Sequence, residues 1–321
     1  MMEKEYGKID DYCLCSEIGT GASCQVFVGY QKENPTKMIA IKIINEESKF
    51  SRDEDIRMMA TEVRVLSKIQ HKNIVKIHAG EETGKLKIGN LEFKEPYTVL
   101  ELAQNGCMVD YLIKTGSMSE ELSRYYFKQL IDGLEQIHAQ GYIHRDIKPD
   151  NLLLNEHFDL LISDFGHCIP MIDGMSEDGS FWTQLGTPIY NPPEASENST
   201  RGSPAVDIFM AGSVLFGFLT GRLPFETGAN KDDKFYKYFF QENPVRFWTE
   251  HLKLFRQQPS QEALDFLTEL FSVDPSKRPS INQIKSHSWL AGGLPSKEMV
   301  TKDMQARLGR MLKERRSGVR R

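Results

Sequence analysis

Residues 144–151 read His-Arg-Asp-Ile-Lys-Pro-Asp-Asn, and residues 164–166 read Asp-Phe-Gly. A short hairpin's length separates the two stretches, so we expect them to form two adjoining loops. Together they supply two acids able to bind Mg²⁺, a base, an amide and a lysine. A site for phosphoryl transfer needs such groups, because a carboxylate must orient a hydroxyl and oxygen ligands must hold a metal bound to phosphates.

Either tripeptide alone is common by chance. Both tripeptides in this order and at this spacing, with a lysine and an asparagine in register, are not expected by chance. With these residues the sequence resembles the eukaryotic protein kinases, in their serine/threonine branch, from about Tyr12 to Trp289. The resemblance implies an enzyme that transfers the γ-phosphate of ATP, with Mg²⁺ as cofactor, to Ser/Thr hydroxyls of protein substrates.

The resemblance also gives each polar residue of these loops a role. Asp146 is expected to align the substrate hydroxyl, and Lys148 to neutralise charge on the transferred group. Asn151, catalytic with those two, and Asp164 are the expected Mg²⁺ ligands. The alternative class is a nucleotide-binding pseudokinase that acts as a scaffold. Such proteins usually lose one of the key charged residues, which are all present here.

Composition agrees with an ordinary globular protein of 321 residues and net charge −5. That charge argues against general nucleic-acid binding, and no apolar run is long enough to span a bilayer, so we expect neither nucleic-acid nor membrane partners. Five cysteines cannot all pair, and the spacing of Cys13 and Cys15 does not suit a zinc knuckle. A reducing cytoplasm is the expected location.

The hydrophobic pattern predicts an α+β protein with a bilobal, kinase-like fold. Strands are expected in residues 12–30, 38–44, 74–80 and 86–101, with turns at Gly84 and Gly89-Asn90 and one main helix from about 56 to 70. Helices dominate afterwards, around residues 111–112, 122–140, 205–220, 261–272 and 281–289. We therefore expect a small β-rich N-lobe at about 12–104 and a larger helical C-lobe at about 105–290. Together they form a catalytic domain over 12–290, followed by a tail at 291–321.

The N-lobe is expected to hold the nucleotide. Lys42 lies on an apolar strand, so its ammonium is either solvated or buried with partners; in kinases this lysine grips phosphates and pairs with a helix glutamate. Glu62 is the matching acid, although an ordinary solvated helix acid is the plain alternative. The preceding stretch resembles the glycine-rich loop, with cysteine at the usual third glycine. Its residues are Ile18, Gly19, Thr20, Gly21, Ala22, Ser23, Cys24, Gln25 and Val26.

The adenine ring is expected next to a hinge at residues 100–103. The resemblance implies that backbone groups of Glu101 and Ala103 bond the purine, with Leu100 guarding the back of the pocket. Apolar side chains should cover the two ring faces, and they are Ile18, Val26, Ala40 and Leu153.

Residues 164–194 resemble an activation segment of the calcium/calmodulin-dependent and AMP-activated kinase group. Thr183 falls at the phosphorylated position of that group, which implies an upstream activating kinase, and Arg145 is the expected basic partner. An unmodified loop threonine is the alternative. Asp207, Glu194 and Arg278 match structural residues of the family. Asp207 is expected to bond back to the catalytic loop, and Glu194 and Arg278 to form a buried ion pair.

The remaining features are two cysteines and the tail. A redox role for Cys24 or Cys168 is conceivable, but inert thiols are the simpler interpretation. Residues 297–321 hold nine Lys/Arg against three Asp/Glu. Val300, Met304, Leu308, Met311 and Leu312 recur at helical spacing. This basic helix is either packed on its own lobe, or a calmodulin target or autoinhibitory arm.

Overall fold

The computed structural model describes residues 6–171, 187–195 and 203–317. The chain divides into two compact units. The N-terminal unit comprises Met1–Gln104 with Asp164–Cys168, and the C-terminal unit comprises Asn105–Ser163 with Ile169–Arg321. The first is built mainly of strands and the second mainly of helices, which confirms the expected α+β division into a β-rich and a helical lobe.

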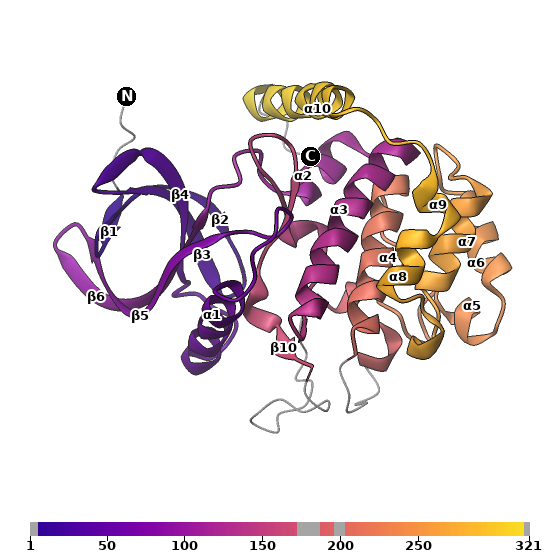
Figure 1. The fold of residues 1–321 in the computed structure, drawn as a ribbon, viewed down its shortest axis with the longest axis horizontal. Coiled ribbons are helices and arrows are strands. Elements are labelled where there is room, and N and C mark those ends of the chain that lie inside the picture. The colour runs from indigo at the N-terminus through magenta and orange to yellow at the C-terminus, as the bar shows by residue number, and fades with distance from the viewer. Residues whose placement is uncertain (1–5, 172–186, 196–202, 318–321) are drawn as a thin grey trace. The chain divides into compact units, whose positions relative to one another are not determined.

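The N-terminal unit is a closed antiparallel barrel with strand order β1-β2-β3-β4-β6-β5 (Figure 1). Its strands are β1 (Gly7–Ile9), β2 (Tyr12–Thr20), β3 (Cys24–Gln31), β4 (Asn34–Ile44), β5 (Ile77–Ile88) and β6 (Leu91–Glu101). Alternate residues of each strand point into the barrel. The core they fill includes Leu14, Phe27, Ile41, Leu86 and Val99.

The strands differ from the prediction in two respects: the position of a turn and the closure of the barrel. Gly84 lies inside β5, beside a register shift, and only Gly89, with φ of 59°, makes the expected turn. Closure depends on β1, which was not predicted and which pairs with both β2 and β5. Inside the wall, Gly29 permits close strand contact, because a Cβ there would lie 2.2 Å from the Cys13 carbonyl oxygen.

One main helix, α1 (Arg52–Leu66), accompanies the barrel. It starts four residues before the predicted position because Ser51 and Glu54 form a capping box that satisfies the first N–H groups. The buried side chains of α1 include Met59, Glu62 and Leu66. The short 3₁₀ turn η2 (Phe165–His167) packs against this helix within the same unit.

The C-terminal unit contains nine helices among its described residues. They are α2 (Met108–Thr115), α3 (Glu120–Ala139), α4 (Ala205–Thr220), α5 (Lys237–Phe240), α6 (Pro244–Leu252), α7 (Gln261–Leu270), α8 (Ile281–Ser286), α9 (Ser288–Ala291) and α10 (Lys297–Ser317). Two small sheets pair β8 (Leu152–Leu154) with β9 (Leu160–Ile162), and β7 (Tyr142–Ile143) with β10 (Ile169–Pro170).

Helix α4 is the centre of this unit. Residues 206–219 are all buried, as expected of a helix that is apolar on every side. Aromatic rings surround it; Phe209 stacks on Phe225 at 5.7 Å between centroids, and Phe216 stacks on Trp248 at 6.2 Å. No described helix is long and apolar enough to cross a membrane.

Candidate active site

The N-terminal unit gathers three of the predicted residues into one ionic cluster. Lys42 Nζ lies 3.0 Å from Glu62 Oε2 and 2.9 Å from Asp164 Oδ1. Glu62 Oε1 also accepts a hydrogen bond from the Phe165 backbone N–H at 3.2 Å. Glu62 is therefore no ordinary solvated acid, since it joins strand β4, helix α1 and the Asp-Phe-Gly turn.

Strand alternation explains how an apolar strand presents this lysine. Ile39, Ile41 and Ile43 point into the barrel core, so Lys42 must point to the opposite face. Burial favours the neutral amine, but the carboxylates of Asp164 and Glu62 outweigh it and raise the pKa of Lys42 well above its ordinary value. The ammonium therefore stays charged at every physiological pH.

The apolar residues predicted around the adenine share that outer face in part. Val26 is paired with Lys42 across β3 and β4, and Ala40 with Leu100 across β4 and β6. Since these residues occupy the register positions of Lys42, they lie on the same side of the sheet. Ile18 is 52 % exposed at the end of β2. Leu153 belongs to the C-terminal unit, on β8.

The predicted glycine-rich loop forms the turn between β2 and β3. Gly21 N–H donates to the Cys24 carbonyl at 2.7 Å, which closes the turn. A Cβ added at Gly19 would meet no atom of the described protein within 4 Å. Internal packing therefore does not require this glycine, which is consistent with a backbone left open to a ligand. Of the other loop residues, Thr20 and Ala22 are exposed, whereas Ser23 and Gln25 are half-buried.

Cys24 is the one buried residue of the predicted glycine-rich loop. Its side chain is buried in a small apolar cluster with Ile44 and Met59 of α1. Burial raises the pKa of the Cys24 thiol, so the thiolate is scarce at neutral pH. Cys168 is also buried, and none of the five cysteines forms a disulfide. These observations favour the inert-thiol interpretation.

The expected hinge begins in the last two residues of β6 and continues beyond it. Leu100 is buried, and Glu101 and Ala103 are half-buried. Glu101 is bonded to Lys76, the residue directly before β5: its N–H donates to the Lys76 carbonyl at 2.8 Å, and its Oε1 accepts from the Lys76 N–H at 2.6 Å. The boundary between the two units falls directly afterwards, between Gln104 and Asn105.

The C-terminal unit gathers the catalytic-loop residues. Asp146 Oδ2 accepts hydrogen bonds from Lys148 Nζ at 2.8 Å and from Asn151 Nδ2 at 2.7 Å. Lys148 Nζ also donates to Thr187 Oγ1 at 3.1 Å. Asp146 itself is 3 % exposed. The loop thus holds a buried carboxylate in one orientation, with a cation directly beside it.

A second buried carboxylate binds the backbone of this loop. Asp207, at the start of α4, accepts hydrogen bonds from the backbone N–H groups of His144 at 2.9 Å and Arg145 at 2.8 Å. That contact confirms its expected bond back to the catalytic loop. His138 Nε2 lies 2.8 Å from the same carboxylate, a partner that the sequence did not reveal. The Glu194–Arg278 ion pair also forms, with N···O distances of 2.6 and 2.7 Å.

Each unit contains a side-chain oxygen that suits a hydrated divalent cation. Both hydrogen bonds of the Asn151 amide use Nδ2, so Oδ1 is the oxygen that can bind a metal. The Asp164 side chain is 38 % exposed, so a cation can reach its carboxylate. Carboxylate and amide oxygens are ligands that Mg²⁺ prefers. Thr183 lies outside the described residues.

Comparison with known proteins agrees with this chemistry. The protein kinase domain family matches residues 12–290. A calcium/calmodulin-dependent protein kinase type 1 of Macrobrachium nipponense is 31 % identical over 95 % of this chain and 84 % of its own length. The probable serine/threonine-protein kinase MARK-A of Dictyostelium discoideum is 31 % identical over 89 % of the chain, but that span is 24 % of the relative.

A CBL-interacting serine/threonine-protein kinase 16 of Arabidopsis thaliana is 31 % identical over 87 % of the chain and 56 % of its own length. These relatives differ in total length, but all of them match the part of the chain that carries both clusters. The chain therefore belongs to the protein kinase family, as a serine/threonine protein kinase.

Proposed function

We propose that this kinase transfers the γ-phosphate of Mg·ATP to Ser or Thr hydroxyls of partner proteins. The observation that carries the proposal is the buried Asp146 carboxylate held by Lys148 and Asn151. Both hydrogen bonds go to Oδ2, so Oδ1 is the oxygen that would accept the substrate hydroxyl. Lys148, fixed by Thr187, would stand beside the transferred group and balance its charge.

We further propose that Asn151 and Asp164 hold Mg²⁺ and that Lys42 binds the α- and β-phosphates. When bound, the metal neutralises charge on the phosphate oxygens. The charged, paired state of Lys42 supports the phosphate role, because the ammonium is pre-oriented by Glu62 and Asp164. Val26 and Ala40, on the face that carries Lys42, would cover one face of adenine together with Ile18, and Leu153 would cover the other. Leu100 would guard the back of the pocket, and hinge backbone groups at Glu101 and Ala103 would bond the purine.

The decisive test is Asp146→Asn. The amide keeps the size of the side chain but cannot accept the hydroxyl proton, so turnover should fall about 10²–10⁴-fold while ATP affinity stays within about twofold. Transfer of ³²P from Mg·ATP to a mixed peptide library measures the first quantity, and fluorescence of a labelled ATP analogue measures the second. Near-normal turnover in the variant would refute the catalytic assignment.

The alternative, a pseudokinase scaffold, predicts a different pair of results. Wild-type protein would then bind nucleotide and yet transfer no phosphate to any peptide, with or without added Mg²⁺. The intact Lys42–Glu62 and Asp146–Lys148 pairs favour activity over this alternative.

We propose that phosphorylation of Thr183 by an upstream kinase raises activity. The support is its register in the sequence and the presence of Arg145, the expected basic partner, whose backbone N–H is bonded by the Asp207 carboxylate. Mass spectrometry of active protein should find phosphate on Thr183. Full activity in a phosphate-free Thr183→Ala protein would show that the segment orders itself.

We propose a catalytic domain at residues 12–290 and a tail at 291–321 whose helix is packed on its own lobe rather than kept as a calmodulin target. One relative's name includes calmodulin. However, the face that calmodulin would need is buried, with Val300 and Met304 both fully covered. A cytoplasmic location is also proposed, supported by five cysteines without a disulfide.

A further inference from the structure

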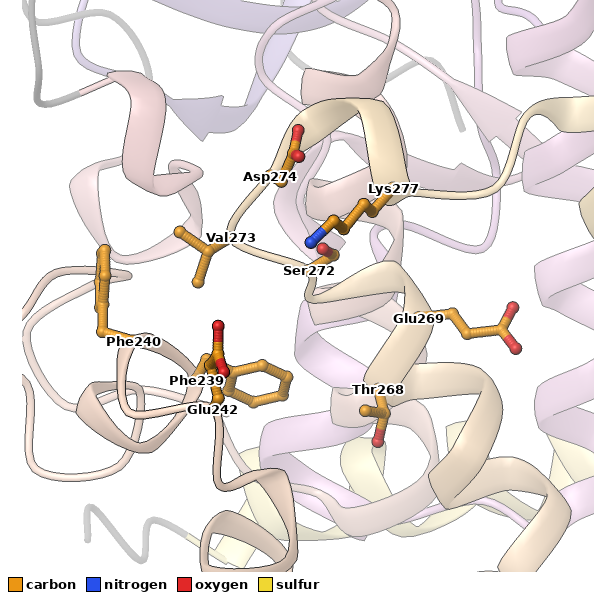
Figure 2. A pocket seen from close by; sticks show the side chains of 9 residues that line it. All are labelled: Phe239, Phe240, Glu242, Thr268, Glu269, Ser272, Val273, Asp274 and Lys277. Atoms are coloured by element: carbon orange, nitrogen blue, oxygen red, sulfur yellow. The ribbon is translucent and has the colours of Figure 1, made fainter.

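An open cavity of about 690 Å³ lies in the C-terminal unit, lined by none of the residues assigned to phosphoryl transfer. It is formed by α5, the end of α7 and the segment that follows α7 (Figure 2). This volume is within the range of roughly 300–1,000 Å³ usual for ligand sites. The lining residues are Phe239, Phe240, Glu242, Thr268, Glu269, Ser272, Val273, Asp274 and Lys277.

The apolar part of the lining is rigid. Phe239 packs on Phe247 at 5.0 Å and on Phe271 at 6.1 Å between ring centroids, so its position is fixed by the core. Phe240 places its ring edge-on to Tyr236 at 5.6 Å and is half-buried. A partner side chain would therefore meet a preformed apolar surface, which lowers the entropy cost of binding.

The charge at the rim is negative. Glu242, Glu269 and Asp274 contribute carboxylates, and Lys277 contributes the only ammonium among the lining residues. Ser276 donates its N–H at 2.9 Å and its hydroxyl at 2.7 Å to Asp274, and these bonds lower the pKa of that carboxyl. Its carboxylate is thus ionised at neutral pH.

The end of helix α7 contributes polar groups to the lining rather than an unmet dipole. Thr268 and Glu269, in its last turn, line the pocket. Just beyond the helix, Arg278 Nε donates to the Ser272 carbonyl at 2.9 Å, so the helix end is already compensated. Attraction for a bound cation therefore comes from the carboxylates of the rim.

Glu242 is the carboxylate best placed to contact a ligand. Figure 2 shows its side chain pointing toward Val273, whereas Glu269 points away from the other lining residues. Glu242 follows α5 with φ of 53°, a left-handed position where glycine is the usual residue. A charged side chain at this position costs stability, and it puts a carboxylate beside the apolar surface.

We infer that this pocket binds a linear segment of a partner protein in which an apolar side chain lies next to an arginine or lysine. The apolar side chain would rest on Phe239, Phe240 and Val273. The cation would pair with the Glu242 carboxylate. Arginine suits the site better than lysine because its planar guanidinium can bond a carboxylate with two N–H groups. The inference does not depend on the proposed phosphotransfer.

Direct binding to the full chain tests the inference without any catalytic readout. The probe is a fluorescein-labelled peptide, Gly-Ser-Leu-Arg-Ser-Gly, followed by anisotropy at low salt. Glu242→Gln should weaken binding about fivefold. Glu262→Gln is the matched control. Glu262 lies in the first turn of α7, whereas the pocket is lined by the last turn, so this change should leave binding unchanged. Thermal unfolding of both variants checks that the fold is intact.

Three outcomes would overturn the inference. The first is no saturable binding of the probe up to about 1 mM. The second is equal affinity for a probe with serine in place of leucine, or glutamate in place of arginine. The third concerns this chain's own end, residues 314–321, which contains Val319 and four arginines. A peptide of that sequence would then bind the pocket about tenfold more tightly than the probe, and removal of residues 314–321 would increase binding of the probe. These two results together would show that the chain itself occupies the pocket.

Discussion

Asp207 illustrates how one buried carboxylate can set the geometry of a catalytic loop. It accepts two backbone N–H groups and lies 2.8 Å from His138 Nε2, while it is fully buried itself. Burial raises the pKa of Asp207, but the hydrogen bond and charge of His138, with the His144 contacts, outweigh burial and lower it. The resulting charge offsets the strain of Arg145, whose φ of 66° costs roughly 1–2 kcal/mol.

His251 is a second residue whose environment has a measurable consequence. Its Nε2–H donates to the Pro224 carbonyl at 3.0 Å, and Phe235 lies 4.1 Å away between ring centroids. Nδ1 is buried without a hydrogen-bond partner among the described residues. Burial lowers the pKa of His251 to about 4, with smaller effects of Asp233, Arg222 and Lys234.

Acidification should therefore destabilise the fold through His251. The unfolded chain takes up this proton near pH 6.5, and the folded chain only near pH 4. The contribution is present in full above pH 6.5 and is lost as pH falls toward 4, to a total of about 3 kcal/mol. Urea unfolding of wild type and His251→Phe at several pH values measures it, and the variant should depend less steeply on pH. Identical slopes for the two proteins between pH 7 and pH 4 would contradict this assignment.

At the scale of elements, α10 is fixed to the end of α2 (Figure 1). Arg307 is 6 % exposed and donates to Thr115 Oγ1 at 2.7 Å, to the Gly116 carbonyl at 3.3 Å and to the Ser117 carbonyl at 3.0 Å. Arg307 thus joins α10 to the last residue of α2 and to the two residues that follow it, which explains why a positively charged segment folds onto the C-terminal unit.

Replacement of Arg307 by alanine should lower the free energy of unfolding by about 2–3 kcal/mol, because the half-buried carbonyls of Gly116 and Ser117 lose their charged donor. Arg310→Ala is the matched control on the same helix; Arg310 is exposed, so its loss should change stability by less than about 0.5 kcal/mol. Urea unfolding compares the two variants. Equal effects of both substitutions would show that Arg307 is no anchor.

The contact between Arg307 and residues 115–117 also distinguishes the two interpretations of the tail. If the helix is an integral part of its lobe, truncation before Ser296 should destabilise the protein and leave Ca²⁺-calmodulin without effect on full-length activity. Stimulation of the full-length kinase by Ca²⁺-calmodulin, together with higher activity after truncation, would instead identify the tail as an autoinhibitory arm.

At the scale of the whole molecule, each unit has its own core. The barrel interior stabilises the N-terminal unit, and α4 with its aromatic neighbours stabilises the other. The proposed ligands are divided between these units, since Lys42 and Asp164 belong to the first and Asn151 belongs to the second. Mg·ATP is therefore expected to stabilise the folded chain as a whole.

At a concentration of 100 times Kd, Mg·ATP should stabilise the folded state by about 2.7 kcal/mol, which raises Tm by roughly 5 °C. Differential scanning fluorimetry measures the shift. Excess EDTA should remove most of it if the metal is needed, and Asp164→Asn should weaken the effect of Mg²⁺. A shift that is unchanged by EDTA would argue against metal-assisted binding.

The sequence by itself determined the residues of the two clusters and most of the elements that carry them. A run of β-branched residues predicted an apolar strand around Lys42, and helical spacing predicted that Glu62 lies on a helix; both predictions are confirmed. Helix α4 begins and ends at the predicted residues, 205 and 220. Such features depend on neighbours a few positions apart, so periodicity and motif spacing are sufficient to find them.

Only the tertiary structure decided the remaining features. His138 meets Asp207 across 69 positions, Arg307 reaches Thr115 across 192, and β1 closes the barrel by pairing with β5. The Cys24 side chain is buried in contact with Met59 of α1. Each of these depends on which distant side chains share a buried volume. Packing sets that outcome, because the burial of polar and apolar groups is settled only when the whole unit has folded.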